Sequence, residues 1–178
     1  MPCPVPPKSR PVIRRLFLAP WNPAARTNPA LRDWLDGHGY ITPHFSWDSY
    51  RGHDPARTQV PRGLMGNAIR LHWDLERFRH ALGDVAMTVD GPYRTIAHNR
   101  EVGGAEGSRH TQADGADFFL SQVDEWVAAS PKVNTRSDVV DVADRIFSSG
   151  GVGNENSGTL HVDSRGYRSR FTTWTRAR

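Results

Sequence analysis

The feature that most constrains the fold of this chain is a helical pattern of apolar residues within positions 61–83. Apolar side chains recur there at alternating intervals of four and three residues, at Leu64, Ala68, Leu71, Leu75, Phe78 and Leu82. This spacing places them along one face of an α-helix. A stripe of this length has to be buried, so we expect one long core helix around which the other elements pack.

The segments after this helix predict an α+β fold. β-branched and aromatic residues favour strands at residues 85–89, 116–120, 159–164 and 167–174, the last two joined by a turn at Arg165-Gly166. Helices are expected at residues 122–129 and 137–147, the latter with Ser137 as its N-cap, and a loop rich in Gly, Asn and Ser at residues 90–108. Helices followed by strands predict helices packed on a small, mainly antiparallel sheet.

A length of 178 residues predicts a single domain with its own core. Residues 1–27 are rich in proline and predict an extended arm, whose apolar side chains dock on the core: Val12, Ile13, Leu16, Phe17 and Trp21. The domain itself is expected to span residues 28–178. It begins with a short helix, because Asn28-Pro29 is an N-cap followed by proline, and Leu31, Trp34 and Leu35 then share one face.

Composition limits the chemistry and the partners. Cys3 is the only cysteine, which excludes an intramolecular disulfide and a cysteine-ligated metal, so any metal must use histidine and carboxylate ligands. The net charge of +4 and the pI of 9.7 favour anionic partners, either nucleic acid or an acidic polymer such as bacterial cell wall. The arginines are scattered, without the block of like charges that a nucleic-acid-binding arm shows, so we expect no nucleic acid.

Apolar runs in the chain are short. None approaches the 18 or so residues of a membrane span, and residues 16–19, although preceded by Arg14-Arg15, are too few for the core of a signal peptide. We therefore expect a soluble monomer that is made in the cytoplasm without a Sec export signal.

Four residues are candidates for a metal site: His110, Asp117, His161 and Asp163. If residues 110–117 were fully extended, their ends would lie about 23 Å apart at ~3.3 Å per residue, too far to share one ion. The turn dipeptide Asp114-Gly115 lets the segment fold back. His161 and Asp163 share one face of a strand, and two histidines with one carboxylate leave a coordination position open for water. Spacing alone favours the alternative of a loop histidine, a capping aspartate and a half-exposed strand histidine.

The residues around these candidates resemble a known family. The chain contains Tyr93-Arg94, Val102-Gly103-Gly104-Ala105, Ser108-Arg109-His110, Asp117, Gly150-Gly151-Val152-Gly153 and His161-Val162-Asp163. This run is similar to the zinc D-Ala-D-Ala carboxypeptidase family, with its pattern S-x-H-x(6)-D followed later by H-x-D. The family also contains vancomycin-resistance dipeptidases, phage peptidoglycan endopeptidases and the hedgehog signalling domain. The resemblance covers roughly residues 62–174 and implies a hedgehog/DD-peptidase-like fold with a zinc site.

Carried over residue by residue, the resemblance implies that His110, Asp117 and His161 are the ligands of Zn²⁺. Arg94 matches the family's substrate arginine, whose planar fork suits a carboxylate or a developing oxyanion. Ser108 matches a serine that hydrogen-bonds substrate, with capping of the loop as its alternative role. Asp163 either orients His161 or a neighbouring residue without contacting the metal itself, or simply ends the strand.

The general base departs from the carboxypeptidase pattern. Where carboxypeptidases place a Glu or His before the last ligand, this chain has Gly158 and Asn156, which cannot take a proton. Glu155 stands six residues before His161, a spacing similar to that in the hedgehog domain. We therefore assign the base to Glu155, with an exposed turn glutamate as the alternative.

These residues lead to a functional hypothesis with one rival. The resemblance implies a zinc metallopeptidase that hydrolyses peptidoglycan stem peptides at the bacterial cell wall, as a carboxypeptidase or an endopeptidase. A phage lysis enzyme or tail-associated enzyme would reach the wall without a signal peptide. The rival is a zinc-binding module that has lost catalysis and recognises cell wall or a protein partner. The other six histidines are expected to be ordinary surface residues.

Overall fold

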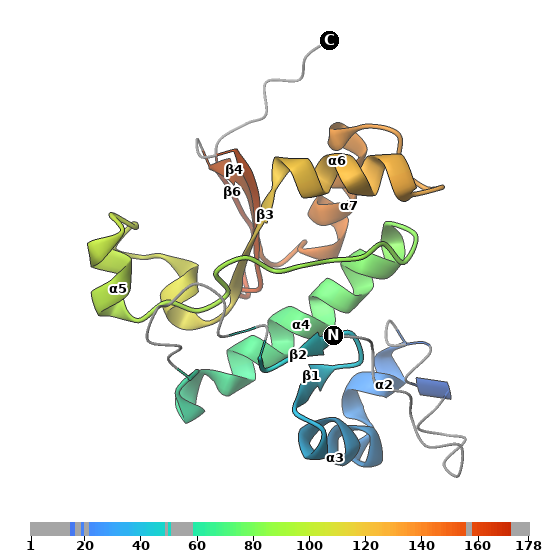
Figure 1. Ribbon diagram of the computed structural model, residues 1–178, viewed down its shortest axis with the longest axis vertical. Helices are drawn as coiled ribbons and strands as arrows, with labels where there is room; N and C mark the ends of the chain where they lie inside the picture. Colours follow the sequence, from blue (N-terminus) through green and yellow to red (C-terminus); the bar gives the residue numbers. More distant parts are fainter. Residues whose placement is uncertain are drawn as a thin grey trace.

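The computed structural model describes residues 15–16, 19, 22–48, 50, 59–155 and 158–171, and only the backbone of residues 154, 155 and 171. Its architecture is α+β, as expected (Figure 1). A four-stranded sheet with two helices lies at one end, a group of short elements lies at the other, and one long helix runs between them. Within the described residues, no helix is both long and apolar enough to cross a membrane.

The long helix is α4 (Met65–Ala81), preceded by the 3₁₀ turn η2 (Arg62–Leu64). It confirms the helical pattern, because five of the six apolar positions are completely buried: Ala68, Leu71, Leu75, Phe78 and Leu82. Removing a continuous apolar stripe from water stabilises this helix more than its intrinsic propensity does. α4 is therefore the support on which both ends of the molecule are built.

The N-terminal elements pack against the first half of α4. They are α2 (Pro23–Thr27), α3 (Pro29–Gly37) and the two-stranded sheet of β1 (Tyr40–Thr42) and β2 (Phe45–Ser46). Asn28 caps α3 as expected, because its side chain accepts a hydrogen bond of 2.9 Å from Leu31 N. α2 lies within the segment that was expected to be an extended arm. Leu16 docks as expected on Leu31, Leu35 and Trp73, whereas Val12, Ile13, Phe17 and Trp21 lie outside the described residues.

The larger sheet has the strand order β3-β5-β4-β6, with β3 (Gly115–Phe119), β4 (Gly151–Glu155), β5 (Thr159–Asp163) and β6 (Ser169–Phe171). One face of it joins α4, α6 (Leu120–Ala129) and α7 (Arg136–Ile146) in the main core, through Ala116, Phe118, Val152, Leu160 and Val162. The alternate residues of the same strands point to the opposite face. α5 (Ile96–Glu101) lies on that side (Figure 1).

The expected C-terminal hairpin is wrong. β6 does not pair with β5; it runs parallel to β4, which lies between them. The sequence predicts no strand for the segment that forms β4, in which Gly151 directly follows Gly150. Backbone pairing with strands on both sides holds this glycine-rich segment extended, and strand propensity does not capture that.

Two further local expectations need correction. Residues 85–89 form no strand; the next residue, Asp90, makes an isolated bridge to Asp117, and Trp126 Nε1 donates to Ala86 O at 2.7 Å. The N-cap of α7 is Thr135 rather than Ser137, because Thr135 forms a capping box with Asp138. The expected loop at residues 90–108 contains the short helix α5.

Candidate metal centre

Three of the candidate ligands converge on the face of the sheet opposite the main core. His110, Asp117 and His161 each offer one ligand atom, these atoms all lie within 4.8 Å of one another, and all three residues are buried. Asp117 and His161 are direct partners across β3 and β5. His110 arrives from the 3₁₀ turn η3 (Arg109–Gln112). The structure thus brings together residues that are separated by as many as 51 positions (161 − 110) in the sequence.

The chain folds back between His110 and Asp117, as the spacing argument required. Ala113 adopts a left-handed conformation with φ of 58°, and the backbone reverses there before β3 begins. The buried hydroxyl of Tyr50 donates to Ala113 O at 2.6 Å and holds this reversal in place. A left-handed conformation is energetically costly for alanine. It persists here because surrounding contacts, such as the hydrogen bond from Tyr50, hold the backbone in place.

The ring of His110 is fixed by a backbone contact. Its Nδ1 donates to Gly91 O at 2.5 Å, so that Nε2 carries the lone pair. Nε2 lies 3.2 Å from Asp117 Oδ2 and has no hydrogen-bond partner among the described residues, although it is buried. Two donors that are each ~2.0–2.2 Å from a tetrahedral ion lie roughly 3.3–3.6 Å apart. A buried lone pair at this distance from a carboxylate oxygen suits a shared cation.

The ring of His161 is fixed from its other side. Its Nε2 lies 3.2 Å from Asp163 Oδ2, and its Nδ1 lies 2.7 Å from Asp117 Oδ1. With the proton of the neutral ring on Nε2, Nδ1 faces the same carboxylate as His110 does. Histidine ligands of metals commonly have their second nitrogen held in this way, so both rings fit a metal site.

Electrostatics favour positive charge at this site. Burial opposes ionisation of Asp117, but the rings of His110 and His161 outweigh it and hold the pKa of that carboxyl below its usual range. Burial also lowers the pKa of His161, but hydrogen bonds to Asp117 and Asp163 outweigh it and raise the pKa to about 9. A metal cation bound between Asp117 and His161 would balance the charge of Asp117 in place of a proton on the His161 ring. Metal binding therefore competes with protonation of His161.

Arg94 lies beside Asp117, and Ser108 is two residues before His110 in the chain. Arg94 Nη2 is 3.7 Å from Asp117 Oδ2. The Arg94 side chain is partly exposed, so it can also contact a molecule that binds from solvent. Ser108 precedes η3 and is half-buried; its carbonyl accepts hydrogen bonds from the backbone and hydroxyl of Thr111. The structure thus places Arg94 at the metal centre and Ser108 at the start of the turn that carries His110; the action of both on substrate stays a prediction.

Glu155 stands one row further along the same sheet. The backbone of Glu155 pairs with Thr159 of β5, and the backbone of Gly153 pairs with His161. Phe119 pairs with Thr159 from the other side and is exposed. The side chain of Glu155 lies outside the described residues, and its role as the base stays a prediction.

The other histidines include one clear correction. His72 was expected at the surface, but it is completely buried in α4, with Nδ1 bonded to Ala68 O at 2.9 Å. His44 is half-buried, and its backbone and ring both bond the buried carboxylate of Glu76 at 2.8 Å. His53 lies outside the described residues. These contacts stabilise the junction of β1, β2 and α4 and stand apart from the metal centre.

Sequence reasoning assigned no role at the metal centre to two residues, Arg165 and Gly151, although Gly151 belongs to the matching motif. Both contact the carboxylate of Asp163, which itself faces His161. The signal for Arg165 was its position two residues after Asp163 and four after His161, but a turn had been assigned there. Gly151 could be recognised only once β4 was known to lie next to β5.

Comparisons with known proteins agree with this geometry. The model of the peptidase M15 family matches residues 48–143, more than half of the chain, and this stretch includes His110 and Asp117 but ends before His161. A zinc D-Ala-D-Ala carboxypeptidase from Streptomyces albus G is 45% identical over 52 residues, which are 29% of this chain. The matched stretch spans only 20% of that relative's length.

Proposed function

Because the chain belongs to the peptidase M15 family, we propose that it is a zinc-dependent peptidase that hydrolyses stem peptides of bacterial peptidoglycan, as a carboxypeptidase or an endopeptidase. The observation that carries the proposal is the convergence of two imidazoles and one carboxylate in a buried cluster, with the second nitrogen of each ring held by a hydrogen bond. The similarity to a zinc D-Ala-D-Ala carboxypeptidase supports the substrate class.

The proposed ligands are His110 through Nε2, His161 through Nδ1 and the carboxylate of Asp117. Three protein ligands are the number found in catalytic zinc sites, where the remaining position takes water or substrate. When bound, zinc lowers the pKa of a coordinated water and polarises a carbonyl. Asp163 keeps the His161 ring oriented for this task from a distance of 3.2 Å.

The remaining roles belong to residues around the ligands. We assign to Glu155 the transfer of a proton from the attacking water to the leaving amine. Arg94 is within 3.7 Å of Asp117, where its guanidinium faces either the oxyanion or a terminal carboxylate of the substrate. Ser108 is assigned a hydrogen bond to the substrate. The positive net charge of the chain favours association with an anionic wall.

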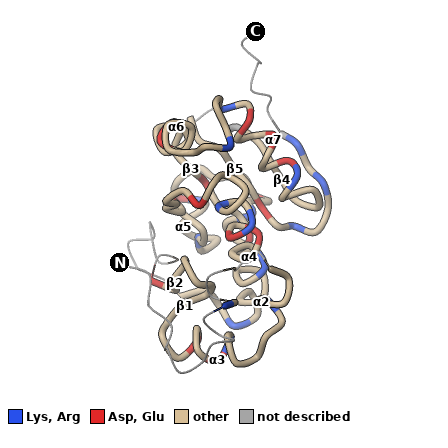
Figure 2. Tube along the Cα trace, turned by 90° about the vertical axis from the view of Figure 1, so that its right-hand side faces the viewer, with Lys and Arg blue, Asp and Glu red and all other residues tan. Residues whose placement is uncertain are grey.

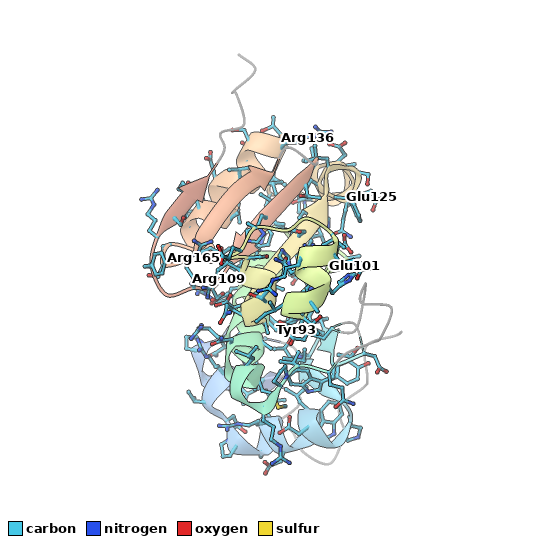
Figure 3. All side chains as sticks on the ribbon, turned by 90° about the vertical axis from the view of Figure 1, so that its left-hand side faces the viewer. Tyr93, Glu101, Arg109, Glu125, Arg136 and Arg165 are labelled. Carbon is cyan, nitrogen blue, oxygen red and sulfur yellow. The ribbon has the colours of Figure 1, made fainter. Side chains whose placement is uncertain are left out.

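Mass spectrometry of purified muropeptides tests the proposal. Incubation with zinc-loaded protein is expected to release a terminal D-Ala or two peptide fragments, and a chelator is expected to stop the reaction. Glu155→Gln should abolish hydrolysis while zinc stays bound. Glu125→Gln is the matched control, because Glu125 is an exposed glutamate on α6, away from the metal centre (Figure 3), and should keep full activity.

A different outcome would favour the rival function. If the wild-type protein binds zinc but leaves every muropeptide intact, the chain is a zinc-binding module without catalysis.

The biological setting is the finer part of the proposal. We propose that the enzyme acts at the bacterial cell wall as a phage lysis enzyme or a tail-associated enzyme. Added from outside to purified sacculi, the protein should release stem-peptide fragments, and a wall whose peptides stay uncut would contradict this setting.

A further inference from the structure

We propose that Arg165 is a positioning residue of the metal centre: its guanidinium locks the carboxylate of Asp163, which in turn keeps the His161 proton on Nε2 and leaves Nδ1 for the metal. This inference rests on the proposed zinc site and extends it beyond the residues that contact the ion. Arg165 lies at the end of the four-stranded sheet (Figure 3).

The contact between Arg165 and Asp163 is bidentate. Nε donates to Asp163 Oδ1 at 2.8 Å, and Nη2 donates to Oδ2 at 2.5 Å. Asp163 is completely buried, and the side chain of Arg165 is only 14% exposed. A planar guanidinium that bonds both oxygens fixes the plane of the carboxylate, which a lysine ammonium cannot do.

Two backbone groups complete the surroundings of Asp163. Oδ1 also accepts from Gly151 N at 2.9 Å and from the backbone N of Arg165 at 3.1 Å. Oδ2 is shared between Arg165 and Nε2 of His161. Both oxygens of Asp163 thus accept hydrogen bonds from Arg165, so the carboxylate presents Oδ2 to His161 as an acceptor, and the ring nitrogen that faces it is the donor.

The packing prevents the carboxylate from turning away. A Cβ atom placed on Gly151 would lie 2.1 Å from Asp163 Oδ2 and 3.0 Å from Arg165 Nη2, so the backbone of β4 closes directly over the pair. The guanidinium carbon also lies 5.5 Å from the centre of the Tyr167 ring. The β4 backbone and the Tyr167 ring therefore both border the guanidinium of Arg165.

This arrangement gives Arg165 a role beyond that of an ordinary ion pair. Exposed ion pairs contribute little to stability, but here one partner is fully buried and would be left without its main counter-charge. Among the residues that the structure describes, two donors to Asp163 remain besides His161. Both are backbone groups that bond Oδ1, so Oδ2 would lose the contact that orients it toward His161. Loss of the group that holds a metal-ligating histidine typically weakens metal affinity by roughly 10–100-fold, and Arg165 acts on that group, Asp163.

Zinc affinity of the folded, metal-free full chain tests the inference. Wild type, Arg165→Ala, Arg165→Lys and Arg168→Ala are titrated with Zn²⁺ in competition with a chromophoric chelator. Arg165→Ala should bind about 10–100-fold more weakly, and Arg165→Lys should fall between it and wild type. Arg168→Ala is the control and should match wild type, because Arg168 is 68% exposed and lies 4.0 Å from Asp144, away from the metal ligands.

A second readout separates positioning from general stability. The visible spectrum of the Co²⁺-loaded protein reports ligand geometry and should change in Arg165→Ala; a merely structural role would lower the melting temperature of the metal-free protein and leave affinity and spectrum unchanged. If Arg165→Ala is unfolded, the Lys variant decides, and wild-type affinity in that variant refutes the bidentate argument. Failure of wild type to bind Zn²⁺ would refute the proposed zinc site itself, and the inference with it.

Discussion

His72 links the stability of the fold to pH. The residue is completely buried on α4; Nδ1 donates to Ala68 O at 2.9 Å, and Nε2 has no hydrogen-bond partner among the described residues. A proton on Nε2 would place an unpaired charge in the core. Burial therefore lowers the pKa of His72 from 6.5 to about 4, although the Ala68 carbonyl and the charge of Glu76 partly offset it.

The direction of the pH effect follows from this difference. In the unfolded chain His72 takes up a proton near pH 6.5, whereas in the folded chain it does so only near pH 4. The contribution of His72 to the free energy of unfolding is therefore fully present above pH 6.5 and is lost as the pH falls toward 4. Linkage gives a loss of about 2 kcal/mol in the free energy of unfolding between pH 7 and pH 5.

Urea unfolding of wild type and His72→Leu at both pH values measures this effect. Groups other than His72 titrate alike in the two proteins, so their contributions cancel in the difference. The variant should lose about 2 kcal/mol less than wild type between pH 7 and pH 5. The His72 Cε1 proton resonance should also stay that of a neutral ring at pH 5. Identical pH dependence of the two proteins would refute the reasoning.

Two further substitutions test the supports of the metal centre. Tyr50→Phe removes the donor to Ala113 O and should lower the free energy of unfolding by about 1–3 kcal/mol in denaturant melts, because a buried carbonyl loses its partner; unchanged stability would mean that the hydroxyl does not hold the chain reversal. Gly151→Ala should cost about 1–3 kcal/mol and weaken zinc binding, because its Cβ would lie 2.1 Å from Asp163 Oδ2. Gly66→Ala is its control, with no atom within 4 Å of the added Cβ, and a similar loss in both variants would contradict this steric argument.

The parts of the fold that sequence reasoning predicted are those with local signals. The apolar stripe of α4 and the Asn28 cap of α3 are short-range features, and both are present. The sequence motif also brought His110, Asp117 and His161 into one hypothesis, which the geometry supports. Charged residues of both signs are interspersed along the chain (Figure 2), in keeping with the scattered arginines of the sequence.

The errors arose where distant contacts decide the structure. β4 contains glycines that ordinarily disfavour strands, but Gly151 is needed where the backbone approaches Asp163. His72 looked like a surface histidine, because a pattern on one helix does not show that β1, β2 and Tyr50 cover the neighbouring face. Arg165 was placed in a turn, and its contact with a buried carboxylate depends on the course of the chain after β5.

The central claim is that two histidines and one aspartate form a zinc centre, and native mass spectrometry during zinc titration tests it most directly. The wild-type chain should take up one Zn²⁺ tightly, and His110→Ala, Asp117→Ala and His161→Ala should each lose that uptake while remaining folded. A wild-type chain that takes up no zinc, or variants that retain it, would contradict the claim.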